Sequence, residues 1–90
     1  MATVMIPAPL RKYASNNALC KVEADNISDM IKEITQRYPD LHKHLIGVDG
    51  KIPSFINIYV DGTDIRNMKK EKTEISVGHT ISIVPAIAGG

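Results

Sequence analysis

Alternating apolar and polar residues mark most of the strands that this chain predicts. In residues 55–60 every second side chain is an isoleucine or a valine, which is typical of a strand with one buried face. Residues 18–24 alternate in the same way, and a β-rich run at 3–6 ends before Pro7, which cannot continue a central ladder. The pattern predicts a hairpin of the first two segments, with strands at 3–6, 18–24, 55–60, 63–65 and 80–84.

One long helix is predicted between Asn26 and Tyr38. Asn26 is a good N-cap, because its side-chain oxygen accepts a hydrogen bond from a free backbone N–H of the first turn. Asp29 places negative charge in that turn, where the helix dipole favours it. Pro39 disfavours helical geometry in the residue before it, so the helix ends near Tyr38. A single apolar stripe follows the helical spacing: Ile27, Met30, Ile31, Ile34 and Tyr38.

The remaining segments complete the predicted fold. Residues 40–54 indicate a helical turn or two followed by a loop, and Asp61-Gly62 is a tight-turn pair between two strands. The resulting order is β-β-α-β-β-β. A mixed sheet packed on one main helix buries all the apolar faces, and this α+β arrangement is that of a ubiquitin-like β-grasp. We expect residues 1–90 to form a single domain whose tail is residues 85–90.

Composition and charge exclude several functional classes. The chain has 90 residues, 43% of them hydrophobic, and 11 basic against 10 acidic side chains give a net charge of +1. This balance argues against nucleic acid or a membrane surface as a partner. No apolar run approaches the roughly 20 residues that span a bilayer. The single cysteine, Cys20, cannot form an internal disulfide, which favours a reducing, cytoplasmic location.

The end of the sequence is an uncharged segment closed by Gly89 and Gly90. Glycine has no Cβ, so its backbone can extend through a slot too narrow for other residues. We expect a flexible tail that presents the Gly90 carboxylate as a reacting group. A carboxylate is a poor electrophile, so a partner enzyme has to activate it.

Other residues leave two interpretations open. Phe55 and Tyr59 lie opposite the buried face of their strand, and are either a partner surface or covered by residues 40–54. Arg11 and Arg66 are either partner contacts or solvated arginines. Because His42 and His44 are two residues apart and do not face each other on a helix, we expect surface histidines and no metal site. No histidine or charge is locally placed to lower the pKa of the Cys20 thiol, so we expect a structural role as a small residue of the strand.

Two segments carry a family resemblance. Residues 55–66, and residues 77–90 with their Gly-Gly ending, are similar to the small sulfur-carrier proteins of the MoaD/ThiS family. Ile6-Pro7, Leu10-Arg11 and the position of the Asn26 cap resemble the CysO-type branch, which serves a thiocarboxylate route to cysteine. The tail lacks the Phe-Pro-Pro approach associated with the small subunit of molybdopterin synthase, which also favours the cysteine branch.

The resemblance implies a protein co-substrate that is not itself an enzyme. Gly90 would be adenylated by an ATP-dependent, E1-like sulfurtransferase enzyme and converted to a thiocarboxylate. The preceding tail residues would thread into the partner's channel: Ala86, Ile87, Ala88 and Gly89. The sulfur would pass to a synthase, either a cysteine synthase that uses pyridoxal phosphate or the large subunit of molybdopterin synthase, or would serve thiamine synthesis. No cofactor would be bound by this chain.

Three functions remain open from the sequence. The first is the sulfur carrier. The second is a ubiquitin-like modifier joined through Gly90 to lysines of target proteins. The third is an interaction-only β-grasp domain in which the Gly-Gly ending has no chemical role.

Overall fold

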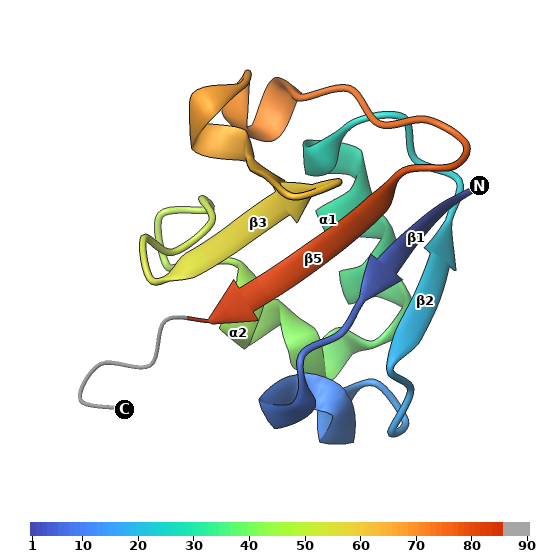
Figure 1. The fold of residues 1–90 in the computed structure, drawn as a ribbon. Helices are drawn as coiled ribbons and strands as arrows, with labels where there is room; N and C mark the ends of the chain where they lie inside the picture. Colours follow the sequence, from blue (N-terminus) through green and yellow to red (C-terminus); the bar gives the residue numbers. More distant parts are fainter. Residues whose placement is uncertain (86–90) are drawn as a thin grey trace.

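The chain forms a five-stranded mixed sheet in the order β2-β1-β5-β3-β4 (Figure 1). The computed structural model describes residues 1–85. Its strands are β1 (Ala2–Met5), β2 (Leu19–Val22), β3 (Ile56–Val60), β4 (Thr63–Asp64) and β5 (Thr80–Pro85). β5 lies in the middle, parallel to β1 and antiparallel to β3, while β1–β2 and β3–β4 are antiparallel pairs. The predicted order of elements along the chain, the mixed sheet and the first hairpin are confirmed.

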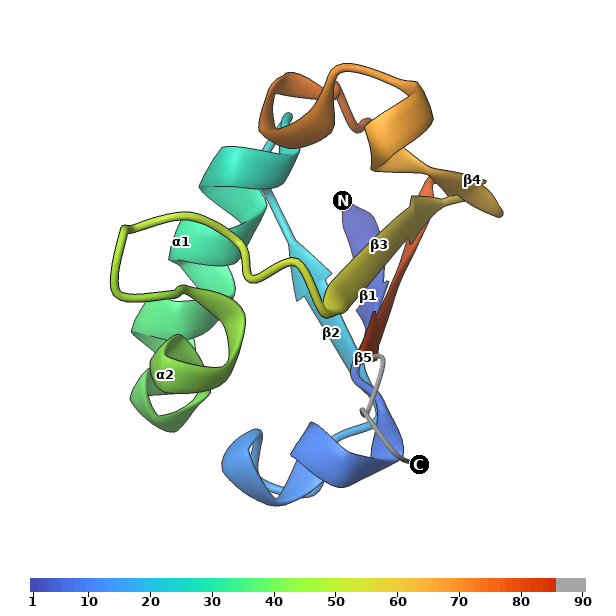
Figure 2. The same cartoon turned by 90° about the vertical axis from the view of Figure 1, so that its left-hand side faces the viewer.

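The helices pack against one face of this sheet. They are α1 (Ile27–Arg37) and α2 (His42–Leu45), with short 3-10 segments at η1 (Ala8–Tyr13), η2 (Pro39–Leu41), η3 (Ile65–Asn67) and η4 (Lys70–Lys72). Figure 2 shows α1 and α2 on the same side of the strands. The arrangement is α+β, as predicted.

Helix α1 begins at the predicted cap. The side-chain oxygen of Asn26 accepts a hydrogen bond of 2.8 Å from the backbone N–H of Asp29. The Asn26 amide in turn donates to the Asp29 carboxylate at 3.1 Å. The helix ends at Arg37, directly before Tyr38 and Pro39, where the proline restricts the backbone. Both predicted boundaries of α1 are confirmed.

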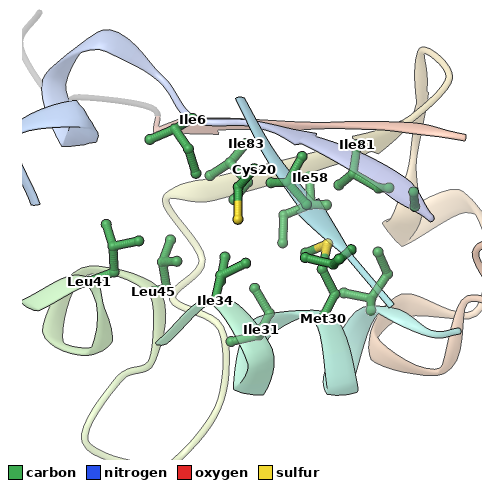
Figure 3. Close-up of a cluster of buried hydrophobic side chains, with 14 of the residues drawn as sticks. Ile6, Cys20, Met30, Ile31, Ile34, Leu41, Leu45, Ile58, Ile81 and Ile83 are labelled. Carbon is green, nitrogen blue, oxygen red and sulfur yellow. The ribbon is translucent and has the colours of Figure 1, made fainter. Parts of the chain in front are cut away.

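The core lies between α1 and the inner face of the sheet. From α1 the predicted stripe is buried except for Tyr38, which packs against the core and is only partly buried. Every second residue of β1, β2, β3 and β5 is buried against the apolar stripe of α1, as the alternation predicted. Figure 3 shows the facing layers, which include Cys20, Met30, Ile31, Ile34, Ile58, Ile81 and Ile83.

Two elements differ from the prediction. Residues 10–13 were predicted as loop, but they belong to η1, which begins after Pro7 and buries Leu10. β2 was predicted to extend to Ala24, but it ends at Val22. The reason is that the backbone N–H groups of Glu23 and Ala24 donate to the Glu33 carboxylate of α1 and leave the ladder.

The Asp61-Gly62 turn is confirmed as a tight hairpin connection. Both residues have positive φ, 49° at Asp61 and 91° at Gly62. Positive φ at both central residues defines a type I′ turn, whose twist matches that of the flanking strands. The flexible tail that the sequence predicted beyond Pro85 lies outside the described residues.

Candidate functional site

The root of the tail is held at the centre of the sheet. β5 pairs with β1 as far as Ser82 and with β3 as far as Pro85, which lies opposite Ile56. The predicted reacting residue Gly90 and the predicted threading residues Ala86, Ile87, Ala88 and Gly89 lie outside the described residues. The structure therefore fixes where the tail begins and the direction in which β5 leads to it.

The sheet surface opposite α1 carries apolar side chains around β5. We name this surface the outer face and define it by Met5, Leu19, Tyr59, Ser82 and Val84. The strand register places Leu19 opposite Met5, Met5 opposite Ser82, and Ser82 opposite Tyr59, so these residues form one row across four strands. Leu19 is 58% exposed, and Met5 and Val84 are each 44% exposed.

Exposed apolar groups of this kind mark interaction surfaces when they are contiguous. Sequence reasoning missed Met5, Leu19 and Val84 as site candidates. The alternation of residues 18–24 did place Leu19 away from the core. Its neighbours on that row, however, depend on the parallel pairing of β1 with β5.

The two aromatic candidates have different environments. Tyr59 lies on the outer face of β3 and is half-buried beside Ser82. Phe55 directly precedes β3 and is 54% exposed. Of the two interpretations left open for Phe55, the covered one is therefore wrong, since residues 40–54 leave its ring in solvent.

The two arginine candidates are exposed but anchored to the backbone beside β5. Arg11 Nε donates to the carbonyl of Ile6 at 3.0 Å. Arg66 Nη2 donates to the carbonyls of Ser54 at 2.7 Å and Ile56 at 3.2 Å. These carbonyls belong to the chain just after β1 and at the start of β3, the two strands that flank β5. Each guanidinium is thus held in place with N–H donors still available to a partner.

The histidines differ from the expectation in one respect. His42 is exposed, as predicted, but His44 is partly buried. Its ring stacks on Tyr13 with centroids 4.4 Å apart. Its Nε2 atom is buried with no hydrogen-bond partner among the described residues. Within residues 1–85, no three His, Cys, Asp or Glu side chains gather in an arrangement able to hold a metal ion.

Cys20 is 4% exposed on the inner face of β2. The expectation that no charge lies near its thiol is wrong, because Arg37 Nη1 of α1 donates to Sγ. Burial raises the pKa of the Cys20 thiol above its ordinary value, and the nearby Arg37 guanidinium opposes that rise only in part. A thiol that is buried and protonated is a weak nucleophile, which fits the structural role predicted for it.

None of the helices formed by residues 1–85 combines the length and the apolar character needed to cross a membrane.

Comparisons with known proteins extend this picture. Residues 4–90 match the model of the ThiS family. The sulfur carrier protein CysO of Mycobacterium tuberculosis is 31% identical over 90 residues, covering 98% of this chain and 97% of the relative. The crystal structure of an Amycolatopsis orientalis BexX/CysO complex matches with a TM-score of 0.91 at 29% identity and full coverage of both chains. The small archaeal modifier protein 1 of Methanosarcina acetivorans matches at 23% identity with a TM-score of 0.88, covering 99% of this chain and 95% of its own, and shows the shared fold alone.

A mixed sheet packed on one helix, with the last strand central and leading into the tail, defines the ubiquitin-like β-grasp class. Within that class, the family match over residues 4–90 and the relative at 31% identity identify the family. The chain belongs to the ThiS family.

Proposed function

We propose that this protein is a sulfur carrier whose Gly90 carboxylate becomes a thiocarboxylate. The observation that carries the proposal is the full-length similarity to a sulfur carrier protein, which includes 98% of this chain. The family match also reaches residue 90, so the Gly-Gly ending lies within the matched region. The position of β5 is consistent with it, because the central strand of the sheet leads directly into the tail.

The chemistry needs a partner enzyme and ATP. The Gly90 carboxylate oxygen attacks the α-phosphorus of ATP, forming an acyl-adenylate and releasing pyrophosphate. A hydrosulfide equivalent then forms a C–S bond as the C–O bond to AMP breaks, which leaves the thiocarboxylate. Gly89, Ala88, Ile87 and Ala86 supply the narrow, uncharged approach that such an active site admits.

We infer that the carried sulfur serves cysteine synthesis. The similarity to CysO favours this branch over molybdopterin or thiamine synthesis. The acceptor would then be an activated, serine-derived amino acid held on a pyridoxal-phosphate enzyme. Both ATP and pyridoxal phosphate would belong to the partners, and this chain would contribute only the carried group, which makes it a co-substrate and not an enzyme.

The outer face is the surface that we assign to the activating enzyme. An enzyme that reacts with the tail has to approach the end of β5, and the outer face borders that end. Its exposed apolar residues supply a contact area, while Arg11 and Arg66 supply fixed cations on the two sides of β5. Phe55 extends the same region at the start of β3.

The test is an intact mass of the protein from its native cells, followed by fragmentation of the C-terminal peptide. We expect a mass gain equal to one sulfur in place of one oxygen, located at Gly90. A chain that lacks Gly90 is the control and should show no such gain. Only unmodified carboxylate, together with conjugates linked through Gly90, would replace the carrier with a modifier. Neither product, even with the activating enzyme and ATP supplied, would leave an interaction-only domain.

A further inference from the structure

Met5 lies near the centre of the outer face. Its register neighbours are Leu19 on β2 and Ser82 on β5, so apolar and small side chains surround it across three strands. The Met5 side chain is 44% exposed, and its Sδ accepts a hydrogen bond of 3.7 Å from Ser82 Oγ. The hydrogen bond holds the thioether over the β1–β5 pairing, facing solvent.

We propose that Met5 is an oxidation site, and that its conversion to the sulfoxide weakens docking of the activating enzyme on the outer face. The inference rests on the proposed function, because it assigns a control point to the same surface. The co-reactant is a hydroperoxide such as hydrogen peroxide. One oxygen atom passes to the thioether: an S–O bond forms, the O–O bond breaks, and the peroxide leaves as water. The methionine loses two electrons and the peroxide gains them.

The physical consequence follows from the position of the sulfur. The thioether is soft and apolar, and it adapts its shape to a facing surface. The sulfoxide is polar, and its oxygen is a much stronger hydrogen-bond acceptor than the thioether sulfur. The Ser82 hydroxyl, which already donates to Sδ, is placed to donate to that oxygen. That bond keeps the S=O group on the outer face, where a docked apolar partner surface would cover it without supplying the bonds it loses from water. The modification is reversible, because reductases return methionine sulfoxide to methionine.

The chain contains its own controls for this reaction. Met68, in the connection between η3 and η4, is 43% exposed, nearly the same fraction as Met5, but lies outside the outer face. Met30 of α1 is fully buried in the core. Met1 is 60% exposed and precedes β1 at the end opposite Met5. Peroxide should therefore oxidise Met1, Met5 and Met68 and spare Met30.

The experiment treats the full-length chain with graded hydrogen peroxide, assigns each sulfoxide by peptide mass spectrometry, and measures the Kd for the activating enzyme. The variants are Met5→Leu and Met68→Leu, both of which preserve volume. We expect oxidation to weaken binding at least tenfold in the wild type and in Met68→Leu. The Kd of Met5→Leu should be the same before and after peroxide, whatever its value in the reduced variant, and methionine sulfoxide reductase should restore the wild-type affinity.

Three outcomes would overturn the switch while leaving the carrier function in place. One is a Met5 that stays reduced while Met68 is oxidised. Another is full affinity after oxidation at Met5. The third is a Met5→Leu variant that loses affinity on oxidation as the wild type does. By contrast, a reduced chain that neither binds the activating enzyme nor acquires sulfur at Gly90 would overturn the proposed function together with the switch.

Discussion

At the scale of single residues, the buried thiol of Cys20 links the core to alkaline stability. Because burial raises its pKa in the folded state, the folded chain holds the proton more tightly than the unfolded chain does. The contribution is therefore fully present below the unfolded thiol pKa, about 8.5, and is lost as pH rises through the folded value. We expect the free energy of unfolding to fall more steeply above about pH 8.5 in the wild type than in Cys20→Ala.

Urea unfolding from pH 7 to pH 10 measures this difference. The comparison of slopes isolates the thiol, because the two proteins differ only at residue 20. Equal slopes would show that the folded and unfolded thiols have the same pKa.

The Asn26 cap gives a second prediction at this scale. Asn26→Ala removes the hydrogen bond to the Asp29 N–H and should lower the free energy of unfolding by about 1 kcal/mol. Asn67→Ala, at an exposed position in η3, is the matched control and should change it by less than about 0.5 kcal/mol. Chemical denaturation of both variants checks the prediction. An equal change in the free energy of unfolding would show that the Asn26 cap does not stabilise the helix.

At the scale of elements, a clasp between α1 and β2 closes the edge of the sheet. The Glu33 carboxylate accepts from the N–H groups of Glu23 and Ala24. Arg37, one turn further along α1, donates to the Lys21 carbonyl at 2.9 Å. These contacts occupy backbone groups in the edge strand β2 and directly after it, which are otherwise free to pair with another chain.

Glu33→Ala should therefore lower the free energy of unfolding by about 1 to 2 kcal/mol, because two backbone donors lose a charged acceptor. Gln36→Ala, on the exposed side of α1, is the control for helix propensity and should be nearly neutral. Hydrogen exchange at Glu23 and Ala24 provides a local measurement, and faster exchange only in Glu33→Ala is expected. Unchanged exchange at these amides would show that the clasp does not protect them.

Periodicity explains which elements were predictable. The alternation in β3 and the helical stripe of α1 repeat often enough to define a buried face, and Asn26 and Pro39 define the helix ends. The 3-10 segment η1 was missed because its six residues, with Pro9 inside and Pro7 directly before them, carry no clear period. The early end of β2 was missed because its cause, Glu33, lies on another element.

The candidate site was predictable only in part for a similar reason. Tyr59 and Phe55 were predicted as candidates because the alternation within their own segment places both aromatic side chains opposite the buried face. Met5 and Ser82 are 77 positions apart in sequence and become neighbours only through the parallel pairing of β1 with β5. A single strand pattern contains no information about that register.

At the scale of the whole molecule, the proposed function divides stability and recognition between the two faces of the sheet. The inner face packs on α1 and accounts for most of the core (Figure 3). The outer face keeps apolar residues exposed to solvent. Substitutions on the outer face should therefore affect docking far more than folding. This separation makes the proposed function testable with variants that remain folded.

Leu19→Lys is the substitution that tests this separation most directly. Leu19 is 58% exposed on edge strand β2, where lysine is well tolerated. The free energy of unfolding should therefore change by less than about 0.5 kcal/mol. On a docked surface the lysine ammonium would be desolvated against apolar groups, so we expect the rate of Gly90 adenylation to fall at least tenfold.

Val77→Lys is the matched control. Val77 is 80% exposed before β5 and lies outside the outer face, so this variant should leave the rate of adenylation unchanged. Pyrophosphate release with the activating enzyme and ATP measures the rate. If both lysine variants are activated as fast as the wild type, the enzyme recognises the tail without the outer face; if both lose activity equally, net charge and not this surface controls recognition.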